Sequence, residues 1–186
     1  MILNADFFER DTLVVWKELL WKELNYINGD WIRFSWIINE VEVYRWLDDE
    51  ASHAYIWKTQ RNKIMFETFW HVYVYFIYWM YNCMNFTTEH IWEAWAVLIR
   101  SAIPVRWIEK MMENRKTSNL KTLTNWPWKL CQAFWINKES YWKKLCLEND
   151  IYIEDIWYVI KTPINIWERV WIKKWIDKPW RFWFKA

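Results

Sequence analysis

The chain contains 21 tryptophans and a single glycine, Gly29, in 186 residues, and this imbalance limits the turns that it can form. A soluble protein of this length has about 13 glycines on average. Several tryptophans stand just past segments with helical periodicity, as Trp21 and Trp135 do. Such positions commonly need a left-handed backbone, which glycine adopts freely and a bulky residue adopts only at a steric cost. We therefore interpret many of the tryptophans as standing at positions that suit glycine.

The remaining composition is that of a soluble protein with one domain, residues 1–186, since no repeat or linker divides the chain. It has 25 Lys and Arg and 23 Asp and Glu, a net charge of +2, which neither requires nor excludes a nucleic-acid partner. Its cysteines, Cys83, Cys131 and Cys146, cannot all pair and lack metal-site spacing. Reduced thiols in a cytoplasmic protein without a metal site are expected.

No segment predicts secretion or a membrane. The N-terminus is charged at Asp6, before the apolar stretch of a signal peptide could develop. The longest uncharged apolar run, 72–84, is interrupted by Asn82 and is shorter than the ~20 residues that cross a bilayer. Its content of Tyr, Val, Phe and Ile predicts a buried strand.

Strand and helix patterns alternate along the chain. Strands are predicted over 32–44, 73–77 and 96–100, and helices over 11–20, with Asp11 as the cap, and from Pro104 and Pro127 onward. In the first strand, period two places Ile32, Phe34, Ile38, Glu40, Glu42 and Tyr44 on one face. A polar loop holding His53 follows. The pattern predicts an α+β fold with antiparallel strands.

Nine short segments together carry a resemblance to a known family. They are 7–13, 40–44, 51–55, 61–66, 73–78, 83–85, 96–100, 129–133 and 179–182. In this order and approximate spacing the chain resembles the alkyladenine (3-methyladenine) DNA glycosylase family over almost its whole length. The expected fold is then one compact domain, with a curved antiparallel sheet flanked by helices and a protruding β-hairpin.

The resemblance also gives the tryptophans an origin. The family's pattern has glycine at the positions held here by Trp21, Trp36, Trp46, Trp57, Trp70, Trp79, Trp107, Trp126, Trp128, Trp135 and Trp142. Trp180, by contrast, is tryptophan in the family too. Our hypothesis is that the gene uses UGA for glycine and was translated with UGA as tryptophan. A glycine-free variant made deliberately would have the same sequence.

What the resemblance implies is an enzyme that flips a damaged purine out of double-stranded DNA and hydrolyses its bond to the sugar. By resemblance, Glu42 is the general base that activates the attacking water. Tyr44, His53 and Tyr75 form the pocket that holds the flipped base between aromatic faces. The implied substrates are 3-methyladenine, 7-methylguanine and hypoxanthine.

Four further residues have implied roles at the DNA. Tyr78 fills the place that the flipped base leaves in the stack, and Arg100 contacts DNA. Asn85 obstructs the exocyclic amine of undamaged guanine, and Leu98 supports the pocket wall. No metal or cofactor is implied. The enzyme is expected to act as a monomer, cytoplasmic and associated with the nucleoid when it is on DNA.

Some positions depart from the family pattern. Gln60 and Phe69 replace prolines, Val43 replaces a smaller residue, and Trp79 follows Tyr78 at a hairpin tip where an indole would obstruct insertion into DNA. About a dozen indoles at tight turns, at roughly 1–3 kcal/mol each, would exceed the stability of a typical domain. With tryptophan at all of them, the chain is expected not to melt cooperatively.

Plainer interpretations stay open. Taken singly, Glu42 is typical of a solvated strand carboxylate and Tyr75 of a cross-strand aromatic; their joint occurrence in the family's order favours the enzyme. One alternative is a non-enzymatic nucleic-acid-binding protein that uses the aromatic and basic residues of 178–185. The other is an inactive glycine-free variant.

Overall fold

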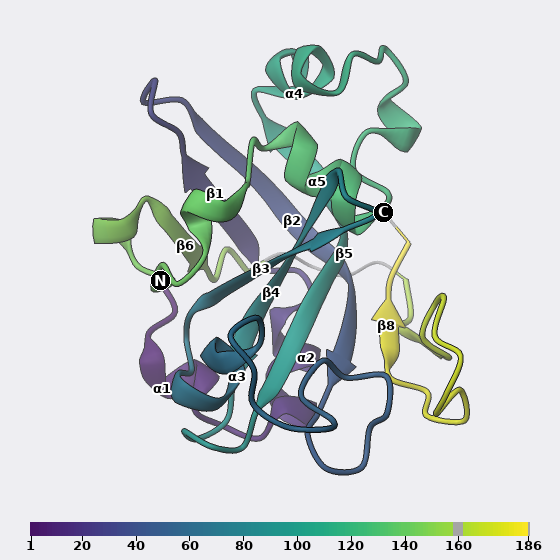
Figure 1. The fold of residues 1–186 in the computed structure, drawn as a ribbon. Helices are drawn as coiled ribbons and strands as arrows, with labels where there is room; N and C mark the ends of the chain where they lie inside the picture. Colours follow the sequence, from purple (N-terminus) through teal and green to yellow (C-terminus); the bar gives the residue numbers. More distant parts are fainter. Residues whose placement is uncertain (158–161, 186) are drawn as a thin grey trace.

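A curved antiparallel sheet forms the body of the protein in a computed structural model, which describes residues 1–157 and 162–185 (Figure 1). The strand order is β3-β4-β5-β2-β1-β6, and β8 pairs with both β2 and β7. The strands are β1 (Glu23–Ile27), β2 (Arg33–Tyr44), β3 (Val72–Ile77), β4 (Tyr81–Thr88), β5 (Trp95–Arg106), β6 (Ile151–Glu154), β7 (Asn165–Trp167) and β8 (Arg181–Trp183). The predicted α+β fold and its protruding hairpin, β3–β4, are confirmed.

β2 is the central strand. It pairs with β5 along most of its length, with β1 over residues 33–37 and with β8 over residues 40–42. Register shifts between Ser35 and Trp36 and around Glu40 mark β-bulges. They interrupt the strict alternation predicted for residues 32–44 and bend the strand, so that β1 and β8 can share it.

Helices gather at the two ends of the sheet. In the view of Figure 1, α1 (Ala5–Phe8), α2 (Thr12–Leu19) and α3 (Lys63–Glu67) lie toward the lower end, and α4 (Ile108–Arg115) and α5 (Pro127–Ala133) toward the upper end. Three short 3₁₀ turns, Leu120–Thr122, Lys138–Ser140 and Leu147–Asn149, complete the connections. Within the described residues, no helix is long and apolar enough to cross a membrane.

The predicted helix boundaries are partly confirmed. The Asp11 carboxylate caps α2 by accepting the Leu13 N–H at 2.6 Å, and Pro127 is the first residue of α5. The helix predicted from Pro104 is present as α4, but its predicted start is wrong, because β5 runs on to Arg106 and contains this proline, and α4 begins at Ile108. Pro104 lies opposite Trp36 at a register shift, a place where a strand tolerates a residue without an N–H.

Two large stacked contacts join the helices to the sheet. Trp16 of α2 stacks on Phe182 of β8 with ring centroids 3.3 Å apart. Trp36 of β2 stacks on Phe134, the residue after α5, at 3.5 Å. All four rings are buried, so the main core fills the space between the sheet and these helices.

The backbone supports the interpretation of the tryptophans. In the described part of the chain, seventeen non-glycine residues have positive φ, and eleven of them are tryptophan: Trp21, Trp31, Trp70, Trp79, Trp92, Trp107, Trp135, Trp142, Trp157, Trp171 and Trp175. The left-handed backbone predicted at Trp21 and Trp135 is confirmed, with φ of 69° and 61°. No steric property of an indole favours this region, whereas glycine enters it freely.

The agreement with the family's glycine positions is partial. Six of the eleven positions have positive φ, namely Trp21, Trp70, Trp79, Trp107, Trp135 and Trp142. The other five, Trp36, Trp46, Trp57, Trp126 and Trp128, have negative φ. At these five the backbone itself does not require glycine, and the codon hypothesis stays a prediction.

Replacing Trp135 with glycine is expected to stabilise the fold by about 1 kcal/mol. The left-handed backbone costs a bulky residue about 1–2 kcal/mol, and the greater freedom of glycine in the unfolded chain offsets part of this gain. The side chain is 59% exposed, so little packing is lost. Denaturant unfolding measures the change. Trp16→Gly, inside α2, is the control and should destabilise by about 3 kcal/mol or more; a loss of stability in Trp135→Gly would contradict the interpretation.

Candidate active site

A cavity of about 580 Å³ opens between the sheet, the β3–β4 hairpin, the start of α5 and residues 170–172. All eight residues singled out from the sequence line it: Glu42, Tyr44, His53, Tyr75, Tyr78, Asn85, Leu98 and Arg100. In sequence they spread over 59 positions, and the sheet brings them together.

One row of paired residues crosses four strands at the base of this cavity. Glu42 of β2 lies opposite Leu98 of β5, Leu98 opposite Asn85 of β4, and Asn85 opposite Tyr73 of β3. Directly opposed residues point to the same face of a sheet. The carboxylate, the apolar wall and the amide therefore have fixed relative positions.

Glu42 is a fully buried carboxylate with three neighbours. Its Oε1 accepts the Val170 N–H at 2.8 Å and lies 3.3 Å from Nη1 of Arg100, and its Oε2 accepts the Tyr44 hydroxyl at 2.7 Å. Burial raises the pKa of Glu42, and the charge of Arg100 and the two hydrogen bonds oppose that rise. A buried carboxyl with a raised pKa is suited to accepting a proton near neutral pH.

Arg100 is also buried and is held by two carboxylates. Its Nε contacts Glu40 Oε1 at 3.0 Å, and the same oxygen accepts from Arg181 Nε at 2.6 Å. Burial would lower the pKa of Arg100, but Glu42 and Glu40 outweigh burial and raise it. The guanidinium faces the cavity floor, so DNA can contact Arg100 only through a group that enters the cavity.

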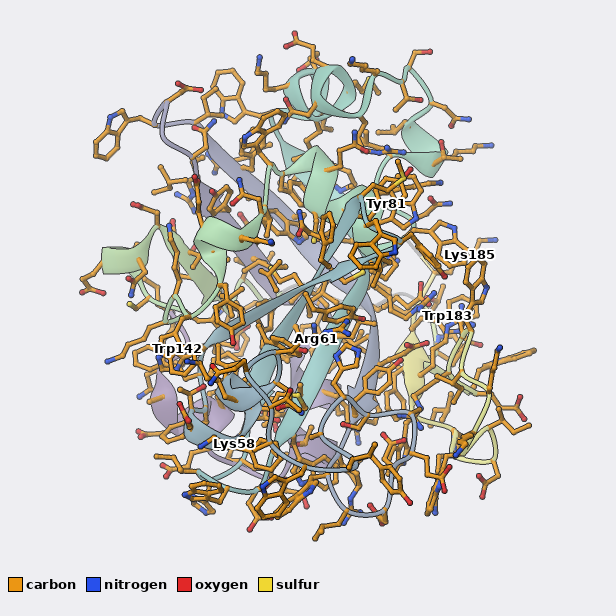
Figure 2. All side chains as sticks on the ribbon, in the orientation of Figure 1. Lys58, Arg61, Tyr81, Trp142, Trp183 and Lys185 are labelled. Atoms are coloured by element: carbon orange, nitrogen blue, oxygen red, sulfur yellow. The ribbon has the colours of Figure 1, made fainter. Side chains whose placement is uncertain are left out.

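Aromatic rings form one wall. The His53 Nδ1 and the Tyr73 hydroxyl are 2.8 Å apart, and the His53 and Tyr75 rings meet edge to face at 4.5 Å. Although part of His53 is exposed to solvent, desolvation by its neighbours, helped by the charge of Arg61, lowers the pKa of His53 to about 4. Figure 2 shows Arg61 near the middle of the face in view, and its guanidinium lies 5.5 Å from the Tyr75 ring centroid.

Burial also sets the state of the phenols. It raises the pKa of Tyr44 and of Tyr75 well above the usual value, and the charge of Glu42 adds to the effect at both. Both hydroxyls therefore stay protonated at neutral pH. The cavity thus presents uncharged ring faces beside a single buried carboxylate.

The amide of Asn85 has a fixed orientation. Its Nδ2 donates to the Tyr73 carbonyl at 3.1 Å, and the side chain is buried next to Leu98. This hydrogen bond and the burial of the side chain favour one orientation of the amide in the cavity wall.

The β3–β4 hairpin ends in an exposed apolar turn. Tyr78 and Trp79 both have positive φ and are 62% and 94% exposed, and Met80 is exposed as well. The hairpin tip predicted at Trp79 is confirmed. The Tyr78 ring lies 6.3 Å from that of Trp171, so the tip stands at the mouth of the cavity.

Sequence reasoning missed several lining residues. Tyr81 and Cys83 alternate with Asn85 along β4, and this period of two could have revealed them. Figure 2 shows Tyr81 beside α5, where it stacks on Trp128 at 4.2 Å. Burial raises the pKa of the Cys83 thiol to about 12. Val170 donates its backbone N–H to Glu42. Sequence patterns concern side chains, so they could not have predicted this contact.

In the part of the chain that the structure describes, no group of three or more His, Cys, Asp or Glu side chains is arranged to hold a metal ion. The chemistry available to these residues is proton transfer by a buried carboxylate beside aromatic and amide groups.

The sequence of the methylpurine-DNA glycosylase (MPG) family matches residues 6–186. The chain belongs to this family. A protein of Alkaliphilus oremlandii named "Putative 3-methyladenine DNA glycosylase" is 40% identical, over 100% of this chain and 96% of its own length. Proteins with the same name from Clostridium acetobutylicum (42% identical; 83% and 79% covered) and Prosthecochloris aestuarii (38% identical; 95% and 84% covered) are similar too.

The resemblance inferred from nine segments is therefore confirmed. The protein is a DNA glycosylase, a hydrolase of DNA repair, and DNA is its substrate. The matched range, residues 6–186, includes every residue that lines the cavity described above.

An NMR titration of this glycosylase is expected to show His53 titrating at about pH 4. Arg61→Gln should raise the pKa of His53, because the positive charge of Arg61 disfavours a second one beside it. The imidazole proton shifts follow both values. Arg10→Gln, at an exposed pair with Glu18, is the control and should leave the titration in place. A midpoint near 6.5 in the unmodified protein would contradict the packing described for His53.

Proposed function

We propose that this glycosylase removes alkylated and deaminated purines, the class of 3-methyladenine, 7-methylguanine and hypoxanthine, from double-stranded DNA. It flips the damaged nucleotide into the cavity and hydrolyses the N-glycosidic bond with water activated by Glu42. It acts as one domain and one subunit, and it leaves the sugar-phosphate backbone intact. The observation that carries the proposal is the buried Glu42 carboxylate in a row with Leu98, Asn85 and Tyr73.

Glu42 is the general base. Tyr44 and Val170 each donate one hydrogen bond to it, and a carboxylate has about four acceptor sites, so capacity remains for a water molecule. As the bond to the base breaks, the sugar develops positive charge, and the carboxylate stabilises it. Arg100, held against both Glu42 and Glu40, orients the carboxylate and contacts the flipped nucleotide.

Neutral aromatic rings bind the base. Purines methylated at N3 or N7 carry positive charge and stack well on electron-rich rings. A pKa of about 4 keeps His53 uncharged at neutral pH, so it does not repel a cationic guest. His53 and Tyr75 touch edge to face, and the base lies against this pair with Tyr44 on its other side.

Selectivity is steric at Asn85. Its amide is held by the Tyr73 carbonyl, so a purine whose exocyclic amine points at Asn85 meets a side chain with little room to move. Leu98 supports the same wall. Undamaged guanine and 7-methylguanine carry the same exocyclic amine, so both fit this wall poorly. 7-methylguanine is still excised, because its weakened bond to the sugar breaks with little further help, whereas the bond of undamaged guanine does not.

Tyr78 fills the gap in the DNA stack. The exposed apolar tip of the β3–β4 hairpin, Tyr78 to Met80, has the character of side chains that wedge between bases from the minor groove. Its nearness to Trp171, which also lines the cavity, supports a wedge beside the mouth through which the flipped base enters.

Glu42→Gln is expected to slow the release of free base strongly while keeping the affinity for a lesion duplex. Removal of a general base lowers the rate by about 10²–10⁴-fold. Single-turnover release of methylated purines from methylated duplex DNA measures the rate, and fluorescence anisotropy measures binding. A non-enzymatic nucleic-acid-binding protein would show no base release before or after the change, which would overturn the proposal.

The pH dependence gives a second readout of the same group. Glu42 must be ionised to act, and burial raises its pKa. The release rate should therefore fall as the pH drops, with a midpoint above the usual range of a glutamate. A rate that is flat down to pH 4 would remove Glu42 from the role of base.

Tyr78→Ala is expected to weaken binding to a duplex in which the lesion is paired, because nothing then occupies the vacated stack. Loss of one stacking side chain costs about 1–3 kcal/mol. Binding to the same lesion in a single strand should change much less, since there is no stack to fill. Equal losses on both substrates would assign Tyr78 to the pocket instead of the groove.

A further inference from the structure

Arg169 is a buried cation in the segment that leads into the cavity. Its guanidinium forms a two-point ion pair with Asp49, at 2.6 Å from Nη1 and 2.7 Å from Nη2, and Nη1 also donates to the Val43 carbonyl at 3.0 Å. Both side chains are fully withdrawn from solvent. The pair joins parts of the chain that are 120 residues apart in sequence.

The guanidinium lies between two aromatic rings. Its carbon is 4.7 Å from the Tyr44 ring centroid and 5.3 Å from that of Trp180. A cation over a ring is attracted to the ring face and holds the ring in place. Because the Tyr44 hydroxyl donates to Glu42, the orientation of this ring also fixes one hydrogen bond of the carboxylate.

The neighbouring residue fixes a second hydrogen bond. Val170 follows Arg169 directly, and its N–H donates to Glu42 Oε1 at 2.8 Å. Anchoring the Arg169 side chain to β2 at Val43 therefore limits how far the Val170 N–H can move from the carboxylate.

Asp49 extends the arrangement to the loop that holds His53. Its Oδ2 accepts the Arg45 N–H at 3.2 Å, and its Oδ1 accepts the Ala51 N–H at 3.1 Å. One ion pair thus connects the proposed base, a ring that binds the flipped purine and the loop that supplies the other ring.

Net stability does not account for such a pair. When two charges are buried, the loss of their hydration costs about as much free energy as their mutual attraction gains. Well-packed apolar residues in their place often give the same stability. Its contacts converge instead on Glu42 and Tyr44. This convergence distinguishes it from the exposed pair Arg10–Glu18, which has no contact with the cavity.

We infer that Arg169 is a positioning residue for base excision: paired with Asp49, it holds the Tyr44 ring and the Val170 N–H against Glu42 and so sets the hydrolysis rate without touching the substrate. This inference rests on the proposed function of Glu42. Arg169 acts by holding the two hydrogen-bond donors of Glu42, the Tyr44 hydroxyl and the Val170 N–H, in place. Displacements of about 1 Å in an active site can lower the rate by up to about 10²-fold.

The test separates positioning from folding by a double variant. Arg169→Gln alone leaves Asp49 as a buried unpaired charge and should be degraded by protease faster than the unmodified protein. Adding Asp49→Asn removes that charge, so Arg169→Gln/Asp49→Asn should be degraded at about the unmodified rate. Single-turnover release of methylated purines is then measured, with active molecules counted by titration with a duplex that contains a tetrahydrofuran abasic-site analogue.

The expected result is a double variant that regains its protease resistance and its binding of the abasic analogue but releases purines at least ~10-fold more slowly. Its pH profile should shift as well. Glu42 loses well-placed donors that oppose the rise of its pKa, so the falling limb of the rate should move to higher pH. Arg169→Lys, which keeps the charge, should recover part of the rate.

Two results would overturn the inference. One is a double variant that releases purines at the unmodified rate with an unmoved pH profile. The other is a double variant that no longer binds the abasic analogue, because the pair would then serve the fold and not the site. Arg10→Gln is the matched control and should change neither rate nor profile. If the unmodified protein releases no purine, the proposed function fails. That outcome is seen in the unmodified protein, whereas both results above are seen only in the double variant.

Discussion

The pairing of β2 with β5 is the contact on which the rest of the structure depends. It sets Glu42 opposite Leu98, and through β4 and β3 it extends this row to Asn85 and Tyr73. A slip of one residue in a strand pair turns every side chain to the other face. Register shifts near Glu40 mark β-bulges in this pair, and β2 also pairs with β1 over residues 33–37 and with β8 over residues 40–42.

β2 also brings several charged side chains together at the cavity. Glu40 and Glu42 meet Arg100, and Arg181 of β8 shares the Glu40 oxygen. These charges are desolvated when the chain folds, not when DNA arrives. The electrostatic environment of the cavity is therefore already in place before any substrate enters it, which is the condition under which fixed charges assist a reaction most.

The sequence predicted the family and part of the local structure. The Asp11 cap, the helix from Pro127 and strands close to β2 and β3 follow from short-range rules. The apolar run 72–84, however, was predicted as one buried strand and forms two, β3 and β4, joined by an exposed turn. The helix predicted from Pro104 begins only at Ile108, because a bulge opposite Trp36 accommodates the proline within β5. Contacts that only the tertiary fold creates could not be predicted from the sequence. The Val170 N–H that contacts Glu42 has no side-chain signature, and Asp49 and Arg169, which form an ion pair, are far apart in sequence.

The hairpin tip has a consequence beyond the site. Tyr78, Trp79 and Met80 form an apolar surface that is exposed in the free protein and would be covered only in a complex. Exposed apolar side chains of separate molecules attract one another in water. These three residues, together with other exposed apolar side chains such as Trp31 and Trp157, therefore favour association between molecules of the free enzyme as its concentration rises.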